Sequence, residues 1–443
     1  MRTLVRRTRW WALLAAPLVL ALAACEPVAH SSFTVRESPA SAVTFRLLSG
    51  DASQVVVTAT AAGATVPGPG VWRVDRSDGS VVELPAGEPT KISSDGERVL
   101  VGTSLWSSGS VLTPPSTVMS EQLSFALFVD TDGQVKTWET ATGTVTPVET
   151  GFPRPAGTTA AIAKGVSDDG RTVQYELQGS NRIERFVDLD AGAAVDRPNG
   201  DGSSGQMDRF VLAARGDAFL HIHQVCDLVL DPEPHDLCDP SWAELVKLPS
   251  GAVARRYTNP DGGTGMRLTD RGFVSASGQV AWVHREQWQA RCTADPTPVG
   301  CVTSAQMVTI WEHGDRSFSL PTSPFPSIGT NDVDSVDVSA RGRFLVADVH
   351  LSVYTFIDKQ GLAGVIDRST GSTENLWGNP LPPSYTETNS VTCSLLRGTP
   401  GSPCSLPAFA VGPQISDDGR VIATTSMSGK GWYEYEADPP AAG

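Results

Sequence analysis

The segment Val166-Ser-Asp-Asp-Gly-Arg-Thr-Val-Gln-Tyr175 decides the fold, because its pattern is that of two strands joined by a tight turn. Asp-Gly favours such a turn, which needs a positive φ, and the β-branched and aromatic residues that follow favour a strand. Six further copies occur at 92–101, 338–346 and 415–423 and, in weaker form, around Asp51, Gly216 and Gly278. We interpret the acidic pairs Asp168-Asp169 and Asp417-Asp418 as turn residues, because they recur at equivalent turns.

A second element follows each hairpin, an apolar strand that ends in a turn and leads to a further strand. Val71–Gly79, Arg185–Gly192 and Gly364–Gly371 are examples. Two hairpins per unit make four strands, so seven units predict an all-β fold, a seven-bladed β-propeller of four-stranded blades. The last unit ends one strand short, and Ser32–Glu37 has strand character. This N-terminal strand is therefore predicted to close the propeller and leave no exposed edge.

The repeat is similar to those of TolB-type β-propellers, which are relatives of the WD-type propellers. The resemblance covers about residues 44–436, although the copies near Asp51, Gly216 and Gly278 lack the full Ser-x-Asp-Gly signature. It implies the fold. It implies little about function, because such propellers serve as adaptors, sensors and accessory domains of enzymes.

The first 24 residues resemble a leader for export. Four arginines precede an apolar run that ends in Leu22-Ala23-Ala24-Cys25, which resembles the lipobox of bacterial lipoproteins. The resemblance implies that Cys25 carries the lipid and anchors the protein on the extracytoplasmic face of a bacterial cell membrane. An ordinary secretory signal is the alternative. The predicted organisation is a signal peptide at 1–24, a lipidated tether at 25–31, the propeller at 32–436 and a tail at 437–443.

The charge of the chain argues against a nucleic-acid partner. The formal net charge is −15, and loss of the four leader arginines leaves 30 basic and 49 acidic residues, a net of −19. Such a surface repels phosphate backbones.

The cysteines support export to an oxidising compartment. There are seven, and Cys25 is the odd one. The other six form three pairs that are close in sequence, Cys226/Cys238, Cys292/Cys301 and Cys393/Cys404. Their spacings do not suit zinc, so we predict three local disulfides.

Four long segments are predicted insertions on one face of the propeller, the face formed by the connections between the second and third strands of a blade and between successive blades. They are 103–122, 226–241, 286–304 and 378–410. Long loops on one face commonly carry binding function. The candidate binding residues are Trp106, His235, Trp242, Trp288, Arg291 and Tyr385, although packing between insertions is the alternative role for each.

No catalytic, metal-binding or cofactor motif stands out. His221 and His223 alternate on one strand and point to the same side, but no carboxylate cluster at ligand spacing accompanies them. We therefore predict no metal, no cofactor and no catalytic residue. The expected protein is a monomeric, membrane-anchored lipoprotein that binds a protein partner or a cell-envelope glycan. The alternative is a propeller hydrolase or lyase that acts on envelope polymers with carboxylates in the axial channel.

Overall fold

The structure is a computed structural model, and it describes residues 33–37, 43–200, 206–231, 233–258, 266–276, 278, 280–289, 301–311, 316–319, 330–340, 342–353, 357–367, 372–375, 410–426 and 432–437. In these ranges the chain is nearly all β, with one helical segment, the 3-10 turn η1 (Glu149–Gly151). Within the same ranges no helix has the length and hydrophobicity that a membrane crossing requires.

The described strands form eight antiparallel sheets, in which consecutive strands pair, and the eighth also takes in the first strand of the chain. The first sheet holds β2 (Val43–Leu48), β3 (Gln54–Ala59), β4 (Gly70–Asp75) and β5 (Val81–Glu83), and the second holds β6 (Pro89–Ile92), β7 (Arg98–Val101), β8 (Ser104–Ser107) and β9 (Ser110–Leu112). The third holds β10 (Phe125–Val129), β11 (Val135–Glu139) and β12 (Val145–Pro147), and the fourth holds β13 (Thr158–Val166), β14 (Thr172–Gly179), β15 (Ile183–Asp188) and β16 (Ala193–Pro198).

The remaining four sheets follow the same order. The fifth holds β17 (Gln206–Leu212), β18 (Ala218–Asp231), β19 (Glu233–Lys247) and β20 (Val253–Thr258), and the sixth holds β21 (Met266–Val274), β22 (Val280–Gln289), β23 (Cys301–Trp311) and β24 (Arg316–Ser319). The seventh holds β25 (Thr330–Val338), β26 (Phe344–Val353), β27 (Ile357–Asp367) and β28 (Ser372–Asn375). The eighth holds β29 (Ala410–Ile415), β30 (Val421–Ser426), β31 (Trp432–Ala437) and β1 (Phe33–Glu37).

The same turn joins the first two strands of seven of the described sheets, and in the third sheet it lies just before the first strand, β10. In each, the N–H of the fourth turn residue donates to the carbonyl of the first, at 2.7–3.1 Å. The fourth residue has a positive φ, and it is glycine in six of the eight turns. In most turns the first residue is serine, whose hydroxyl accepts the N–H five residues later, as Ser167 does from Thr172 at 2.9 Å. Asp169 accepts from Ser167 and Arg171, which confirms its predicted role as a turn residue.

The eight described sheets exceed the seven predicted from the repeat. The missed turn is Ser120–Leu123 in the third sheet, where Leu123 occupies the glycine position with a φ of 56°. The strand before this turn is reduced to a bridge between Met119 and Ala126. Without glycine and without a full first strand, the sequence of this hairpin does not match the other copies.

The eight sheets surround one axis, as a propeller requires. The second residue of every turn lines a central cavity of about 600 Å³; these residues are Gly50, Ser94, Glu121, Asp168, Ala214, Ala276, Ala340 and Asp417. Backbone N–H groups also link neighbouring turns. Asp168 donates to the Ala214 carbonyl at 2.8 Å, and Asp417 of the eighth sheet donates to Gly50 of the first at 2.7 Å. The ring of sheets is therefore closed.

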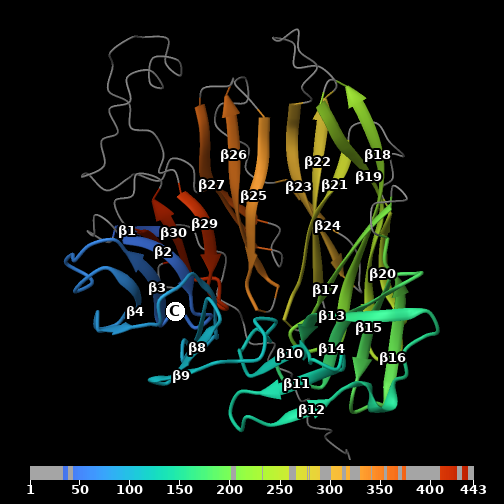
Figure 1. Ribbon diagram of the computed structural model, residues 1–443. Coiled ribbons are helices and arrows are strands. Elements are labelled where there is room, and N and C mark those ends of the chain that lie inside the picture. The colour runs from blue at the N-terminus through green and yellow to red at the C-terminus, as the bar shows by residue number, and fades with distance from the viewer. Residues whose placement is uncertain are drawn as a thin grey trace, which may run out of the picture.

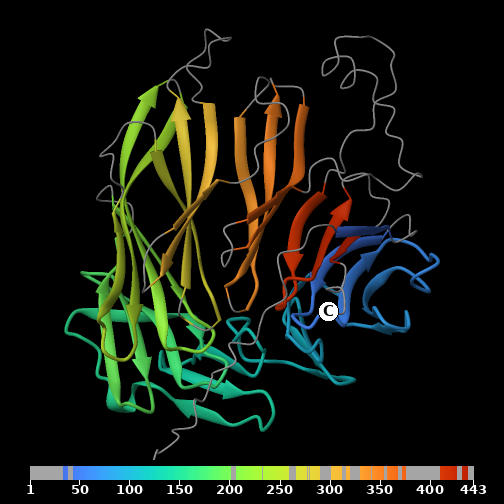
Figure 2. The same ribbon diagram turned by 180° about the vertical axis from the view of Figure 1, so that it is seen from behind.

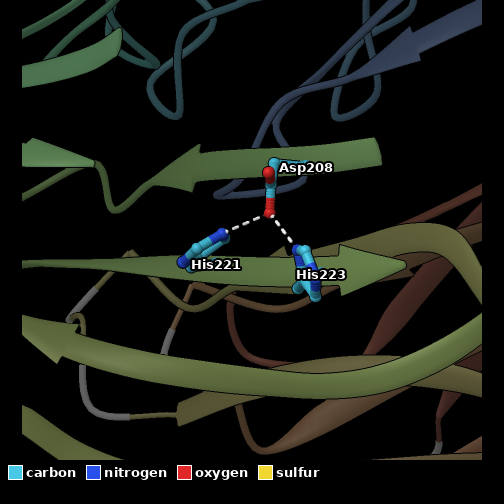
Figure 3. A group of neighbouring side chains, drawn as sticks. All are labelled: Asp208, His221 and His223. Atoms are coloured by element: carbon cyan, nitrogen blue, oxygen red, sulfur yellow. Dashed lines mark hydrogen bonds and ion pairs between the residues drawn. The ribbon is translucent and has the colours of Figure 1, made fainter. Parts of the chain in front are cut away.

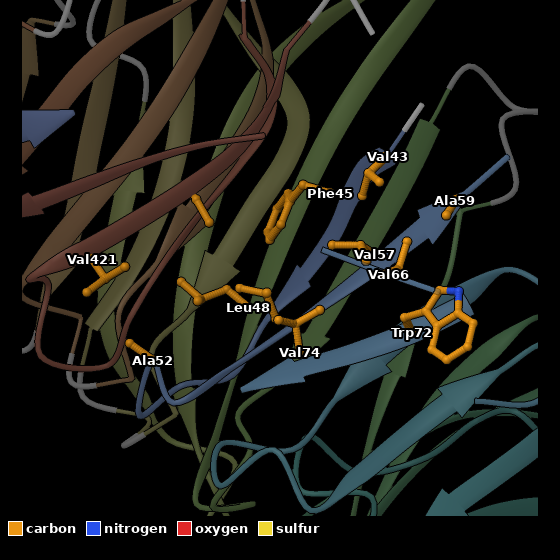
Figure 4. Close-up of a cluster of buried hydrophobic side chains, with 12 residues drawn as sticks. Val43, Phe45, Leu48, Ala52, Val57, Ala59, Val66, Trp72, Val74 and Val421 are labelled. Carbon is orange, nitrogen blue, oxygen red and sulfur yellow. The ribbon is translucent and has the colours of Figure 1, made fainter. Parts of the chain in front are cut away.

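The ends of the chain form the predicted closure. β1 pairs with β31, with Val35 opposite Tyr435, and so supplies the outer strand of the eighth sheet. The first strands (blue) lie beside the last ones (red) in Figures 1 and 2. A buried cluster that includes Phe45, Leu48 and Trp72 of the first sheet also includes Val421 of the eighth (Figure 4). This shared core joins the two ends of the ring.

The predicted insertions differ from one another in the structure. Segment 103–122 is not an insertion, because it contains β8, β9 and the turn of the third sheet. Segment 226–241 extends the hairpin of β18 and β19, which is long in Figure 1, and its register sets Cys226 opposite Cys238. In 286–304, only the ends on β22 and β23 are described, and 378–410 is described only at Ala410. The disulfides stay predictions, because Cys292, Cys393 and Cys404 lie outside the described residues and no cysteine side chain is described.

Candidate functional site

A cavity of about 1060 Å³ lies between the fourth and fifth sheets, and we call it the inter-sheet cavity. The fourth sheet contributes the turn from β14 to β15 (179–183) and the segment that leaves β16 (196–200). The fifth sheet contributes Asp208, His221, His223, Trp242 and Glu244. The cavity therefore opens on the face formed by these two kinds of connection, where the sequence predicts the binding surface.

Strand pairing in the fifth sheet brings together side chains that are far apart in sequence. On β18, His221 and His223 are two residues apart and share one face, as predicted. Asp208 of β17 lies directly opposite His223, and Trp242 of β19 lies opposite His223 on its other side. Three adjacent strands thus present a carboxylate, two imidazoles and an indole to one cavity.

The three ionisable side chains are in direct contact. Asp208 Oδ1 lies 2.7 Å from His221 Nε2 and 2.7 Å from His223 Nδ1 (Figure 3). The side chains of Asp208 and His221 are each 6% exposed, and that of His223 is 17% exposed. Burial alone would raise the pKa of Asp208, but hydrogen bonds from His221, the Gly200 amide and His223 outweigh it, so this pKa lies below its usual value. The group thus holds an ionised carboxylate.

Aromatic rings hold the two imidazoles in place. His221 stacks on Phe210 with ring centroids 4.2 Å apart, and it meets the edge of Trp242 at 4.6 Å. His223 stacks on Trp242 at 5.0 Å, and the Arg256 guanidinium lies 4.5 Å from the centre of the Trp242 ring. Such packing restricts the rotamers of both histidines.

The fourth sheet adds charged side chains to the cavity and beneath it. Arg182 in the turn from β14 to β15 pairs with buried Glu176 at 2.6 Å, and Asp196 on β16 forms two 2.7 Å hydrogen bonds with Arg185. Beneath the cavity, Glu184 accepts hydrogen bonds from Gln174 and Asn199. Burial raises the pKa of Glu184 to about 7, although these two hydrogen bonds act in the opposite direction.

The central cavity also has carboxylates, but all four have partners. Asp168 accepts the Gln122 N–H and Asp337 accepts the Ile415 N–H, both at 2.7 Å. Asp417 accepts the Ser94 hydroxyl, and Glu121 pairs with Lys91 at 3.0 Å. Three of these contacts join neighbouring sheets, and the contact of Asp417 with Ser94 joins the eighth sheet to the second. The described lining includes no histidine. These carboxylates hold the turns together.

The structure places the predicted binding residues in different surroundings. Trp242 lines the inter-sheet cavity, whereas Trp106 is buried in β8 beneath Arg73, so its predicted place in an insertion is wrong. The side chains of His235 on β19 and Trp288 on β22 lie outside the described part. Arg291 and Tyr385 lie outside the described residues altogether.

Asp208 is the residue that the sequence interpretation missed. The hairpin register could have identified Asp208 from the sequence. Residues equally far from the turn at Gly216 face each other in an antiparallel hairpin. Counting outward from the pair Leu212 and Phe219 therefore sets Asp208 opposite His223. The carboxylate that seemed absent beside the histidines is on the preceding strand.

No family model matches the chain. A search of curated proteins gives no match either. Among solved structures, the chain is similar to an oligogalacturonate lyase from Vibrio parahaemolyticus, with 9% identity, a TM-score of 0.44 and coverage of 93% of this chain and 98% of that one. It is also similar to the WD40 domain of SCAP from fission yeast, with 9% identity, a TM-score of 0.41 and coverage of 91% and 97%. A third is a β-propeller domain from Myceliophteria thermophila, with 10% identity, a TM-score of 0.38 and coverage of 92% and 100%.

Proposed function

We propose that this protein is a lipid-anchored, extracytoplasmic binding protein whose inter-sheet cavity holds a cell-envelope glycan. The observation that carries the proposal is the cavity itself, a concavity of about 1060 Å³ lined by Trp242 and by charged and amide side chains. Its volume is at the upper end of small-molecule sites, and a sugar offers many hydroxyls to such a lining. The cavity also lies on the face of the propeller for which the sequence predicts the binding surface.

A protein partner is supported less well by the described surface. Protein-binding patches bring large apolar side chains together, with aromatic anchors at the centre. The exposed large apolar residues of the described ranges stand on four different sheets: Val111 on β9, Val145 on β12, Ile162 on β13 and Val253 on β20. Single exposed apolar residues of this kind are ordinary on a soluble surface.

Catalysis in the axial channel is also supported less well. A hydrolase or lyase needs a carboxylate or histidine that is free to move a proton at the substrate. The described carboxylates of the central cavity instead accept hydrogen bonds from other sheets or pair with Lys91. We therefore favour binding over chemistry.

Replacement of Trp242 and Arg182 tests the binding proposal. We expect a fragment of peptidoglycan or of a neutral envelope polysaccharide to bind the detergent-purified full chain in calorimetry. Trp242→Ala should weaken that binding at least about tenfold, since it removes an amphipathic ring from the cavity wall. Arg182→Ala should also weaken it, and this change is mild for the fold because Glu176 keeps Lys164 as a partner.

The control for this test is Arg171→Ala on the opposite face. Arg171 is 61% exposed in the turn between β13 and β14, far along the sheet from the cavity turn of β14 and β15. The Arg171→Ala substitution should leave glycan binding unchanged. Unchanged binding in both cavity variants, or no glycan bound by the wild type, would contradict the proposed function.

The anchor is a separate proposal with its own test. It rests on Leu22-Ala-Ala-Cys25 and the odd number of cysteines, and Cys25 lies outside the described residues. Cys25→Ala should abolish incorporation of a fatty-acid analogue and release the protein from the membrane fraction, because a diacyl anchor accounts for most of the membrane affinity. A wild-type protein without lipid label would show an ordinary secretory signal instead.

A further inference from the structure

We infer that Asp208, His221 and His223 form a binding site for a divalent transition-metal ion at the wall of the inter-sheet cavity. The site goes beyond the proposed function, because it stands on these three side chains whether or not the cavity holds a glycan. It departs from the prediction from sequence, which assigned no metal.

The donor atoms suit such an ion. The two histidine nitrogens and one carboxylate oxygen all lie within 4.8 Å of one another, with Asp208 Oδ1 at 2.7 Å from each nitrogen. Metal–ligand bonds to imidazole and carboxylate are about 2.0–2.2 Å, which places ligand atoms about 3 Å apart in an octahedral site and somewhat farther apart in a tetrahedral one. An opening of a few tenths of an ångström brings both contacts of Asp208 to the octahedral spacing. Nitrogen and oxygen donors together favour zinc, manganese, iron or cobalt over calcium and magnesium.

The three donors come from one side and leave the other side open. All three stand on one face of the hairpin of β17 and β18, with their side chains converging in Figure 3. The same three residues line the inter-sheet cavity. Three protein ligands with open positions toward a cavity are typical of a site where an external oxygen completes the coordination. If the proposed function holds, a sugar hydroxyl or carboxylate is such an oxygen.

The surroundings hold the ligands ready for an ion. Asp208 Oδ2 accepts the Gly200 N–H at 2.7 Å, which leaves Oδ1 to face the histidines. Phe210 and Trp242 pack against the imidazoles, so their rings have little freedom to turn away. An outer hydrogen bond to a metal ligand, such as that from Gly200 to Asp208, usually raises affinity. Buried His221 Nδ1 has no such partner among the described residues.

The competing interpretation is a metal-free hydrogen-bond network. In that case each imidazole donates its one N–H to Asp208 Oδ1, and the cluster serves only to satisfy a buried carboxylate. The two interpretations differ in what Asp208→Asn and His223→Asn do. A network loses stability in both variants, whereas a metal site also loses a measurable ion.

The test is metal binding by the full chain in detergent after treatment with a chelator. We expect one equivalent of Zn²⁺ to bind in calorimetry, and Co²⁺ to give visible d–d absorption that reports nitrogen and oxygen ligands. Asp208→Asn and His223→Asn should each weaken binding of both ions by at least about 100-fold, since each removes or neutralises a ligand. Circular dichroism of each variant verifies that it is folded, and if one is not, the other still decides.

Two controls make the result specific. His350→Asn changes a histidine on β26 in the seventh sheet, and Glu97→Gln changes an exposed carboxylate in a turn of the second sheet, outside the inter-sheet cavity. Both should keep the ion. No saturable binding of either ion by the wild type, or full binding by both Asp208→Asn and His223→Asn, would overturn the metal site. Glycan binding is measured separately, in the presence of a chelator. The metal site and the proposed glycan binding can therefore fail independently of each other.

Discussion

Gly170→Val should lower the free energy of unfolding by about 2–5 kcal/mol. Gly170 has a φ of +70°, which a β-branched residue resists. A Cβ there would also lie 2.6 Å from the ring of Phe125 in the preceding sheet, closer than real contacts allow. The change therefore combines local backbone strain with a steric clash between two sheets, and urea denaturation measures the sum.

Gly143→Val is the matched control for this clash. Gly143 has nearly the same φ, +71°, but a Cβ there would meet nothing within 4 Å. Its cost should be that of the backbone alone, about 1–2 kcal/mol. The difference between the two variants measures the packing of a turn on the neighbouring sheet. Equal losses would show that the approach of Phe125 to Gly170 adds nothing to the cost of the substitution.

Stability should fall as the pH rises from about 5 to about 8, and Glu184 should cause most of the fall. Burial raises the pKa of Glu184 from 4.5 to about 7 in the folded protein. The folded state therefore holds this proton more tightly than the unfolded chain. The stabilisation from protonated Glu184 is fully present below pH 4.5, and it is lost as the pH rises through the folded-state pKa of about 7. A shift of this size corresponds to about 3 kcal/mol.

Glu184→Gln should remove most of this slope, because an amide keeps the contacts to Gln174 and Asn199 without titrating. Denaturation at pH 5 and pH 8 measures the change for each protein. Burial raises the pKa of Asp337 to about 6, so this residue also makes stability fall as the pH rises. The Glu184→Gln variant should therefore keep a smaller dependence of stability on pH. Glu97→Gln in an exposed turn is the control and should behave as the wild type. A wild type that is more stable at pH 8 than at pH 5 would contradict this prediction.

The parts of the fold that depend on local chemistry were predictable. Each Ser-x-Asp-Gly turn forms from contacts within six residues, as Ser167, Asp169 and Thr172 show, so its sequence is its signature. The closing strand followed from counting strands, and β1 pairs with β31 as expected. The sequence pattern did not predict the third sheet, because Leu123 adopts the positive φ that glycine usually takes. The side chain of Leu123 is fully buried. Burial there stabilises a backbone that the sequence pattern alone disfavours.

By itself, the sequence determined that this protein is a closed ring of antiparallel hairpins, because turn chemistry and strand alternation act between near neighbours. Only the tertiary structure decided the number of sheets and the burial of Trp106. The meeting of Asp208 with His221 and His223 follows from a hairpin register that the sequence carries, although the repeat pattern did not reveal it. Asp208 is 13 residues from His221, and their contact depends on the register of β17 against β18. The inter-sheet cavity depends on how the fourth sheet stands against the fifth. Packing between sheets sets that arrangement, and the pattern along one strand does not encode it.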